Sequence, residues 1–182
     1  MESEASRNWN KVLGISVAVV IVIGVAFVIG AFAVGPSRAK AGGGYLPSAV
    51  LTMPVGNLPA RTADGNALTL LVRIAETPEA RKAGLASVGT KALDATVLLY
   101  VQPKITTARI TYVMSGICAP LELAVIGELG DIVAIKKVEA NAKSIAITER
   151  HRYVLAAKEG VLGKLGIVKG VSVSPVDMKR IS

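Results

Sequence analysis

Cysteine and histidine are scarce in this 182-residue chain, which contains one of each, Cys118 and His151. A lone cysteine cannot close an intramolecular disulfide bond, and one cysteine with one histidine falls short of the three or four protein ligands of a zinc site. We therefore predict a domain that folds on its hydrophobic core, with no metal and no cofactor. The chain also lacks a glycine-rich phosphate loop, a helix with paired histidines and a nucleophilic-serine elbow, which leaves no catalytic residue to assign.

Aromatic residues make up only 4% of the chain, and acidic residues are outnumbered, with 13 Asp and Glu against 21 Lys and Arg. The cations are scattered singly or in pairs such as Lys136-Lys137, without the basic runs and interleaved aromatic residues of nucleic-acid grooves. We therefore expect no nucleic-acid partner. The single Gln, the few Asn and the heavy use of Val, Ile and Ala are typical of thermophilic proteins.

Charge is absent from residues 12–35, and this stretch is long enough to cross a hydrocarbon core of ~30 Å as a helix. It predicts a single transmembrane helix that ends at Pro36 and contacts membrane lipid. The tripeptide Ala31-Phe32-Ala33 also fits a signal-peptidase site. A stretch of this length exceeds the apolar core of an ordinary signal peptide, which favours an anchor over a cleaved leader.

The cations that flank this segment are balanced, since Arg7 and Lys11 precede it and Arg38 and Lys40 follow it. The positive-inside count is therefore a tie. A short tail followed at once by a membrane segment and then by the whole folded domain is the usual layout of a signal anchor. We expect the N-terminus inside and the C-terminal domain outside the cell membrane.

Four parts follow from these observations. Residues 1–11 form a neutral tail, residues 12–35 the anchor, residues 36–59 a linker rich in Gly and Pro, and residues 60–182 a β domain. Because the tail is neutral, the net charge of +8 belongs to the part after the anchor.

The β domain shows the two-residue period of half-buried strands. In residues 67–75, leucine, valine and isoleucine alternate with Thr69 and Arg73, and Asp64-Gly65 predicts a hairpin turn that pairs this strand with the 51–58 region. Further strands are predicted at residues 96–101, 105–113, 121–126, 132–138, 144–148, 152–157 and 171–174.

Two short helices interrupt the strands. Thr77 reads as an N-cap before Pro78 and Glu79, with Gly84 ending the helix, and residues 159–165 form the second helix. The predicted fold is mainly β: a compact β-sandwich or barrel with two short helices, preceded by the transmembrane helix.

Three blocks of this domain resemble one family. Residues 71–85 read LVRIAETPEARKAGL, and residues 112–126 read YVMSGICAPLELAVI. A closing segment begins with RYVL at residues 152–155 and continues through Gly160, Gly166 and Gly170. Together they resemble the signature blocks of the family called domain of unknown function 192, over residues 67–175.

The resemblance implies a compact, mostly β domain, often exported or membrane-anchored, with no assigned activity. The chain departs from the family pattern where polar residues are expected. Ser115-Gly116-Ile117 replaces Lys-Asn-Thr, Glu122 replaces Asp, Ala156 replaces Glu and Val171 replaces Asp. These losses favour a contact role over chemistry.

The connection that includes Met114, Ser115, Gly116, Pro120 and Glu122 is the candidate binding surface, because Gly- and Pro-containing loops carry function on rigid β scaffolds. The same residues also fit a purely structural turn, in which the methionine fills the core. The glutamate alternates with leucines and either faces solvent or pairs with a cation on the next strand.

The remaining nucleophile and imidazole do not favour catalysis. Cys118 lies among apolar residues, and His151 lies in a charged stretch typical of a solvated turn. Two function classes stay open. The first is a non-enzymatic contact or accessory module, anchored in the membrane and partnered with a membrane or envelope protein complex. The second is a small-ligand-binding or enzymatic domain that uses the Met114 to Glu122 loop.

Overall fold

A computed structural model of the chain describes residues 43–62 and 64–181. The predicted tail at residues 1–11, the predicted transmembrane helix at 12–35 and the cleavage motif at 31–33 lie outside these residues. Among the helices that are described, none has the length and apolar character to span a bilayer.

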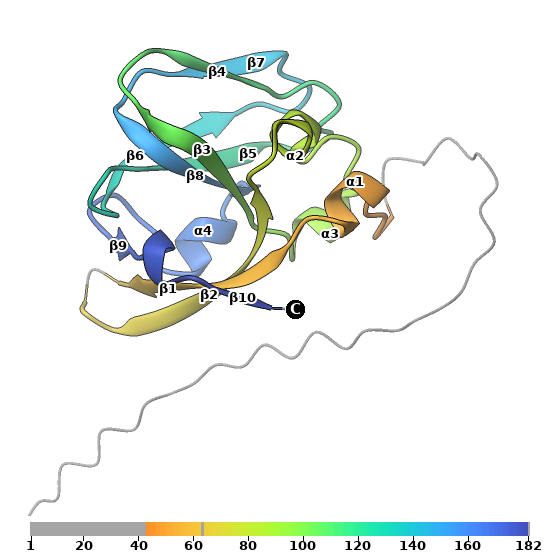
Figure 1. Ribbon diagram of the computed structural model, residues 1–182. Helices are drawn as coiled ribbons and strands as arrows, with labels where there is room; N and C mark the ends of the chain where they lie inside the picture. The colour runs from red at the N-terminus through yellow and green to blue at the C-terminus, as the bar shows by residue number, and fades with distance from the viewer. Residues whose placement is uncertain (1–42, 63, 182) are drawn as a thin grey trace, which may run out of the picture. The chain divides into compact units, whose positions relative to one another are not determined.

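The described part of the chain is mainly β, with ten strands and four short α-helices (Figure 1). The elements follow in the order α1 (Ser48–Leu51), β1 (Val55–Arg61), β2 (Ala67–Ala75), α2 (Pro78–Ala83), α3 (Thr90–Leu93), β3 (Leu98–Thr106), β4 (Ile110–Val113), β5 (Leu121–Ile126), β6 (Ile132–Val138), β7 (Ser144–Ile147), β8 (His151–Lys158), α4 (Val161–Lys164), β9 (Ser172–Val173), a 3-10 helix η1 (Pro175–Asp177) and β10 (Lys179–Ile181).

The main sheet has the strand order β10-β1-β2-β3-β8-β5-β6. All neighbours are antiparallel except β2 and β3, which run parallel and need the long connection through α2 and α3. Strand β9 pairs with β1, and the residues around it bond to the start of β6, through Ile132 N to Val171 O at 2.8 Å and Gly170 N to Ile132 O at 2.9 Å. The hydrogen-bonded strands therefore form a closed, barrel-like ring.

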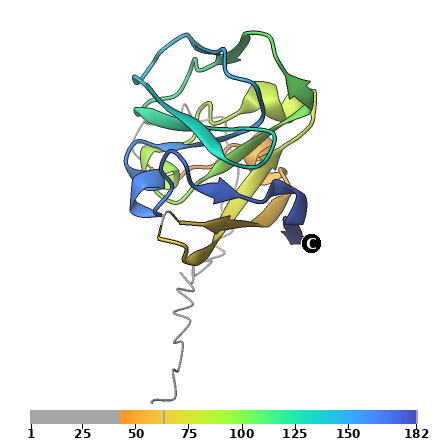
Figure 2. The ribbon, with the colours of Figure 1, turned by 90° about the vertical axis from the view of Figure 1, so that its left-hand side faces the viewer.

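A second layer covers one side of this ring. Strands β4 and β7 form a separate two-stranded sheet, which lies at the opposite end of the domain from β1 and β2 (Figures 1 and 2). The core accordingly divides into two clusters. In β5, Leu123 and Val125 belong to the cluster shared with the β4–β7 layer, and Ala124 and Ile126 belong to the cluster inside the ring. Both faces of β5 are buried, which explains its continuous apolar sequence.

Local signals predicted most elements well. The strands at residues 67–75, 121–126 and 132–138 are confirmed without change as β2, β5 and β6. Helix α2 is also confirmed: the Thr77 hydroxyl accepts a hydrogen bond from Ala80 N at 3.1 Å, and Gly84 ends the helix at φ 51°. A Cβ atom on this glycine would lie 2.4 Å from the Tyr100 hydroxyl, so the position requires glycine for space as well as for φ.

Two predictions are corrected. A single strand at residues 105–113 is wrong, because β3 ends at Thr106 and β4 begins at Ile110. The Thr106 hydroxyl accepts from Ala108 N at 3.3 Å and donates to Ala108 O at 3.1 Å, and this local turn breaks the strand. The linker assigned to residues 36–59 also extends too far, because its last part forms α1 and most of β1.

Candidate binding site

A cleft of about 390 Å³ opens at the end of the ring where β3 ends and β8 begins. Its walls are the β5–β6 hairpin turn, the first residues of β8, the end of β3 and the segment from β9 through η1. The side chains that matter for its chemistry are Ile105, Glu128, Leu129, Arg152, Val176 and Asp177.

The hairpin turn reaches the β9 segment through a glycine. Gly130 has φ 89°, and its carbonyl accepts a hydrogen bond from Val173 N at 2.8 Å. A Cβ atom at this position would lie 2.1 Å from Val173 O, so any other residue would push the two segments apart. Glycine here brings the two walls of the cleft together.

The opposite wall depends on an irregularity in the sheet. The register between β3 and β8 shifts between Val101 and Thr106, and Pro103, which has no backbone N–H, lies within the shifted stretch. The regular ladder between the strands is interrupted there. Arg152 and Tyr153 of β8 line the cleft beside this interruption.

Arg152 carries the most unusual group in the cleft. Its Nε is buried and has no hydrogen-bond partner among the residues that the structure describes. Its guanidinium carbon lies 5.4 Å from the centre of the Tyr153 ring, a cation–π distance that supports the charge without satisfying the N–H. A buried donor without an acceptor costs free energy, and because this atom is closed to solvent, the N–H is a local defect in the polar packing beside the cleft.

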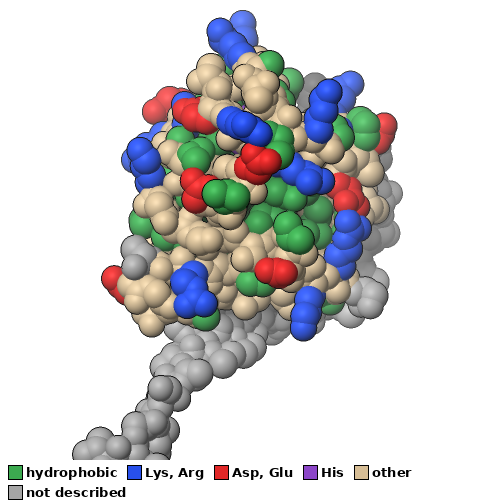
Figure 3. All heavy atoms as spheres, turned by 60° about the vertical axis from the view of Figure 1, so that its left-hand side comes forward, with side chains coloured by type: hydrophobic (Ala, Val, Ile, Leu, Met, Phe, Trp, Pro, Cys, Tyr) green, Lys and Arg blue, Asp and Glu red, His purple; other side chains and the backbone are tan. Residues whose placement is uncertain are grey.

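The carboxylates of the cleft do not supply that acceptor. Glu128 forms an ion pair with Arg150 at 2.7 Å, and Asp177 is exposed at the end of η1. The rim is apolar, with 91% of Leu129 and 88% of Val176 exposed. When the side of the domain with β6 and β9 is turned forward, apolar side chains gather among Lys, Arg, Asp and Glu (Figure 3).

The connection predicted to bind a ligand is separate from this cleft. Met114 is buried at 1% exposure and fills the core, whereas Ser115 and Gly116 are exposed at a turn in which the glycine has φ 81°. Pro120 is half-buried, and its carbonyl accepts from Glu159 N at 3.0 Å. The structure brings none of these residues to the Arg152 cleft, and binding at this loop stays a prediction.

Glu122 neither faces solvent nor pairs with a cation across the sheet. It is 6% exposed, and its Oε1 accepts a hydrogen bond from Leu162 N at 2.6 Å, in the first turn of α4. Its cross-strand neighbour Lys137 pairs instead with Glu159 at 2.6 Å. The carboxylate therefore attaches α4 to β5, since an acceptor near a helix start satisfies a free amide.

His151 is fully buried, so its interpretation as a residue of a solvated turn is wrong. Its Nδ1 lies 2.7 Å from Glu149 O and its Nε2 lies 2.8 Å from the Tyr112 hydroxyl. Because a carbonyl oxygen only accepts, Nδ1 donates and Nε2 accepts from the tyrosine, which in turn accepts from Gln102 at 3.0 Å. Burial raises the pKa of Tyr112 and keeps its proton in this chain of bonds.

Cys118 makes its hydrogen bond elsewhere, with Sγ 3.6 Å from Val88 O. The cysteine and the histidine thus have different partners and form no nucleophile–base pair. Within the described residues, no cluster of three or more His, Cys, Asp or Glu side chains has the arrangement of a metal site.

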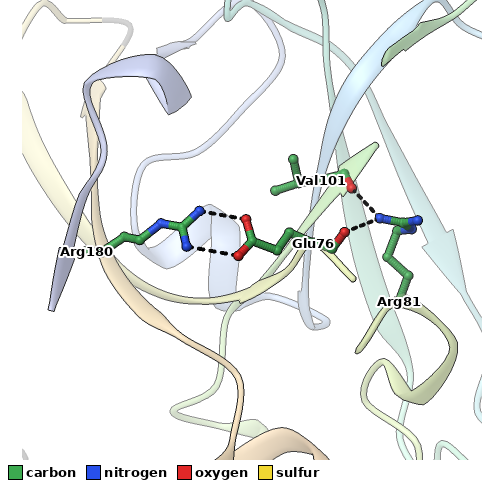
Figure 4. A network of polar contacts seen from close by, with 4 residues as sticks. All are labelled: Glu76, Arg81, Val101 and Arg180. Carbon is green, nitrogen blue, oxygen red and sulfur yellow. Dashed lines mark hydrogen bonds and ion pairs between the residues drawn. The ribbon is translucent and has the colours of Figure 1, made fainter. Parts of the chain in front are cut away.

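A further polar network fastens the end of the chain. Glu76, the residue after β2, forms a bidentate ion pair with Arg180 of β10, at 2.9 Å and 2.6 Å, and so connects two segments that lie on either side of β1 (Figure 4). Arg81 donates to the carbonyls of Glu76 and Val101, the second at 3.1 Å. Glu76 and Arg81 belong to the motif at residues 71–85, and both serve the fold.

The cleft was not predicted from the sequence. Leu129 could have indicated it, because a large apolar residue in a Gly-Glu-Leu-Gly hairpin turn is exposed to solvent and is typical of an interaction surface. Arg152 is the first residue of the RYVL block, but its missing partner is visible only in three dimensions.

One known protein family matches the domain. The sequence profile of DUF192, described as "Uncharacterized ACR", matches residues 60–175. No curated protein sequence shows a significant match to the chain.

Two solved structures share the fold. A candidate transcription regulator from Sinorhizobium meliloti 1021 is 23% identical, with a TM-score of 0.58 over 67% of this chain and 94% of that one. A protein of unknown function from Novosphingobium aromaticivorans is 18% identical, with a TM-score of 0.52 over 72% of this chain and 99% of that one. At these identities the likeness concerns the fold alone.

Proposed function

Because this chain belongs to the DUF192 family of uncharacterised proteins, we propose its function from its own geometry: it is a membrane-anchored, extracytoplasmic contact module that binds a partner in the Arg152 cleft and is not an enzyme. The observation that carries the proposal is the apolar rim of the cleft, where Leu129 and Val176 are 91% and 88% exposed. A bound partner that covers these side chains removes apolar surface from water.

The surroundings of Arg152 support a contact role. Leu129 and Val176 stand at the rim with nearly their whole side chains exposed, and large apolar residues in that position are typical of interaction sites. Cys118 and His151 are each engaged in contacts that stabilise the fold. Neither is placed as an activated nucleophile or a base beside the cleft.

The anchor is proposed from the sequence. Residues 12–35 have the length and the lack of charge of a single-pass helix, and the folded domain comes after them in the sequence. Placement outside the cytoplasm follows from the signal-anchor layout. A module attached in this way contacts other proteins at the same membrane surface, so the proposed partner is a membrane or envelope protein complex.

Site-directed photocrosslinking tests the contact site. Full-length chains that carry benzoylphenylalanine at Leu129 or Val176 are expected to give one discrete adduct each in cells. Val113, an apolar residue of β4 that is 60% exposed, is the matched control and should give none. The same adduct should weaken in Arg152→Gln. No adduct at either rim position, or equal adducts at the control, would show that the cleft is not the contact site.

Protease accessibility tests the topology. Protease added to cells whose outer barrier has been removed should degrade the domain while the membrane remains intact. A domain that is protected until the cells are lysed would contradict the extracytoplasmic placement.

A further inference from the structure

We infer that the outward side of strands β10, β1 and β2, together with helix α1, contacts an anionic phospholipid surface; we call this surface the β1 face. The side chains that meet the lipid are the apolar Leu51, Leu71 and Ile181 and the cationic Arg61 and Lys179. None of them lines the Arg152 cleft. The inference rests on the proposed function, since it names how the anchored domain meets its membrane.

The two-residue period of the strands defines the β1 face. Alternate side chains of β1 and β2 enter the core inside the ring, so the residues between them point outward. Asn57 of β1 pairs with Leu71 of β2 and with Lys179 of β10, which brings these side chains to the same outward side. Ile181 follows two residues after Lys179. The three strands lie side by side in Figure 1.

Helix α1 extends this face. Arg73 lies two residues after Leu71 in β2 and is therefore on the same side of the sheet. Its guanidinium donates to the carbonyls of Val50 and Leu51, at 3.0 Å and 3.3 Å, which attaches the end of α1 to the outward side of β2. Leu51, Leu71 and Ile181 are each between 48% and 54% exposed. Large apolar side chains that gather on one face are typical of a contact surface.

The charge of the β1 face is positive. Its three strands and α1 contain four cations and no Asp or Glu. Arg180 is paired with Glu76, whereas Arg61 and Arg73 donate only to backbone carbonyls, and Lys179 has no ion pair among the described residues. Such a surface is complementary to anionic headgroups. Lysine is depleted in protein–protein interfaces, so this composition favours lipid over a protein partner.

The position of the predicted anchor also favours the membrane. Only seven residues, 36–42, separate the predicted transmembrane helix from Gly43, where the described chain begins. A segment of this length spans on the order of 25 Å when fully extended. Residues 43–47 then lead directly into α1, and the carbonyl of Tyr45 accepts from Gly89 N at 2.8 Å, which fixes this entry to the domain. The lipid surface is thereby kept within reach of α1, the first element of the β1 face.

Photocrosslinking in nanodiscs tests the inference. The full-length chain carries benzoylphenylalanine at Leu71 and is held in nanodiscs of phosphatidylcholine, either alone or in a 2:1 mixture with phosphatidylglycerol. We expect a lipid adduct, identified by intact mass, with a yield at least about threefold higher in the anionic nanodiscs. Val113 of β4, at the opposite end of the domain, is the matched control and should give little lipid adduct in either.

Two double variants separate the β1 face from charge in general. Arg61→Gln with Lys179→Gln removes two exposed cations of the face, and it should lower the Leu71 yield in the anionic nanodiscs to that in phosphatidylcholine alone. Arg109→Gln with Lys143→Gln removes the same charge from exposed residues next to β4 and β7, and it should leave the yield unchanged. The comparison of the two kinds of nanodisc uses the native charges, so it decides the inference even if a variant fails to fold.

Equal lipid adducts at Leu71 and Val113, or equal yields at Leu71 in the two kinds of nanodisc, would overturn the inference. A protein adduct at Leu71 in cells, in place of the lipid adduct, would also overturn it and would assign the β1 face to a protein partner. These results leave the crosslinks at Leu129 and Val176 unaffected, so they are distinct from failure of the proposed contact site. A chain that neither kind of nanodisc retains would contradict the proposed anchor and, with it, this inference.

Discussion

Replacement of Tyr112 by phenylalanine tests the buried polar chain between β3, β4 and β8. The substitution keeps the ring, which packs edge-on against Tyr100 at 5.3 Å and 75°, and removes only the hydroxyl. That hydroxyl donates to His151 Nε2 at 2.8 Å and accepts from Gln102 at 3.0 Å. Packing therefore changes little, and the expected effect is the loss of hydrogen bonds.

The two lost bonds do not cost the same. Gln102 is half-buried and can turn its amide toward water, whereas His151 is fully buried and its Nε2 is left without a donor. A buried polar group without a partner costs about 1–3 kcal/mol, so we expect the free energy of unfolding to fall by about 2 kcal/mol. For a domain of this size, that loss lowers the Tm by roughly 8 °C.

Urea unfolding and thermal melts of the full-length chain, followed by circular dichroism, measure this loss. Tyr45→Phe is the matched control, because Tyr45 is 52% exposed and should lose nothing measurable. The double variant Tyr112→Phe with His151→Leu should lose less than the sum of the two single variants, because the histidine acceptor is then absent too. A Tm within 1 °C of the wild type for Tyr112→Phe, or strict additivity in the double variant, would refute the reasoning.

Three further predictions follow from the other polar contacts. Glu122→Leu should lower the free energy of unfolding by about 1–3 kcal/mol, because it leaves the Leu162 N–H without its acceptor. Glu122→Gln should lower it less, because the amide oxygen is still an acceptor. Equal losses in urea titrations would exclude the attachment of α4 through this carboxylate. Burial raises the pKa of Tyr100, so the folded chain holds a proton that the unfolded chain releases at high pH. The free energy of unfolding should therefore be independent of Tyr100 below pH ~10 and should fall above that pH. A fall of the same size in Tyr100→Phe, measured by urea titrations across this pH range, would contradict this explanation. Arg180→Gln should change the free energy of unfolding by less than ~1 kcal/mol, because its ion pair with Glu76 is partly exposed. Amide hydrogen exchange at residues 179–181 should become faster. Unchanged exchange would mean that the ion pair does not hold β10.

Elements with a local cause were predictable from the sequence. The alternation at residues 67–75 identifies β2 because every second side chain enters the core, and the Thr77 cap and Gly84 stop identify α2 because both act within one helical turn. The β-rich fold and the family resemblance over residues 67–175 also follow from local pattern, and the family profile matches residues 60–175.

Elements without a local signal were missed. Strand β10 has only three residues and is held by its pairing with β1 and by the Arg180–Glu76 ion pair, both of which join distant parts of the chain. The break at Thr106 depends on a side-chain turn that competes with the strand, and alternation alone does not reveal it.

The candidate sites differ in the same way. The residue pattern around Met114 and Glu122 attracted attention because glycine, proline and a carboxylate stand close together in sequence, yet folding buries the carboxylate against α4. Arg152 was not selected from the sequence. Its distinguishing feature is an Nε–H without a hydrogen-bond partner, and this depends on all the neighbours that folding brings close to it.

The sequence by itself determined that this is a β-rich domain of a known family, preceded by an uncharged segment long enough to span a membrane, because composition and periodicity are properties of the chain. Tertiary structure decided which polar groups are satisfied and which are not. Closure of the strands into a ring brings β9 and η1 against the β5–β6 turn and the start of β8, segments far apart in sequence. The cleft forms where they meet, and the Nε of Arg152, one of the lining residues, is buried without an acceptor among the described residues.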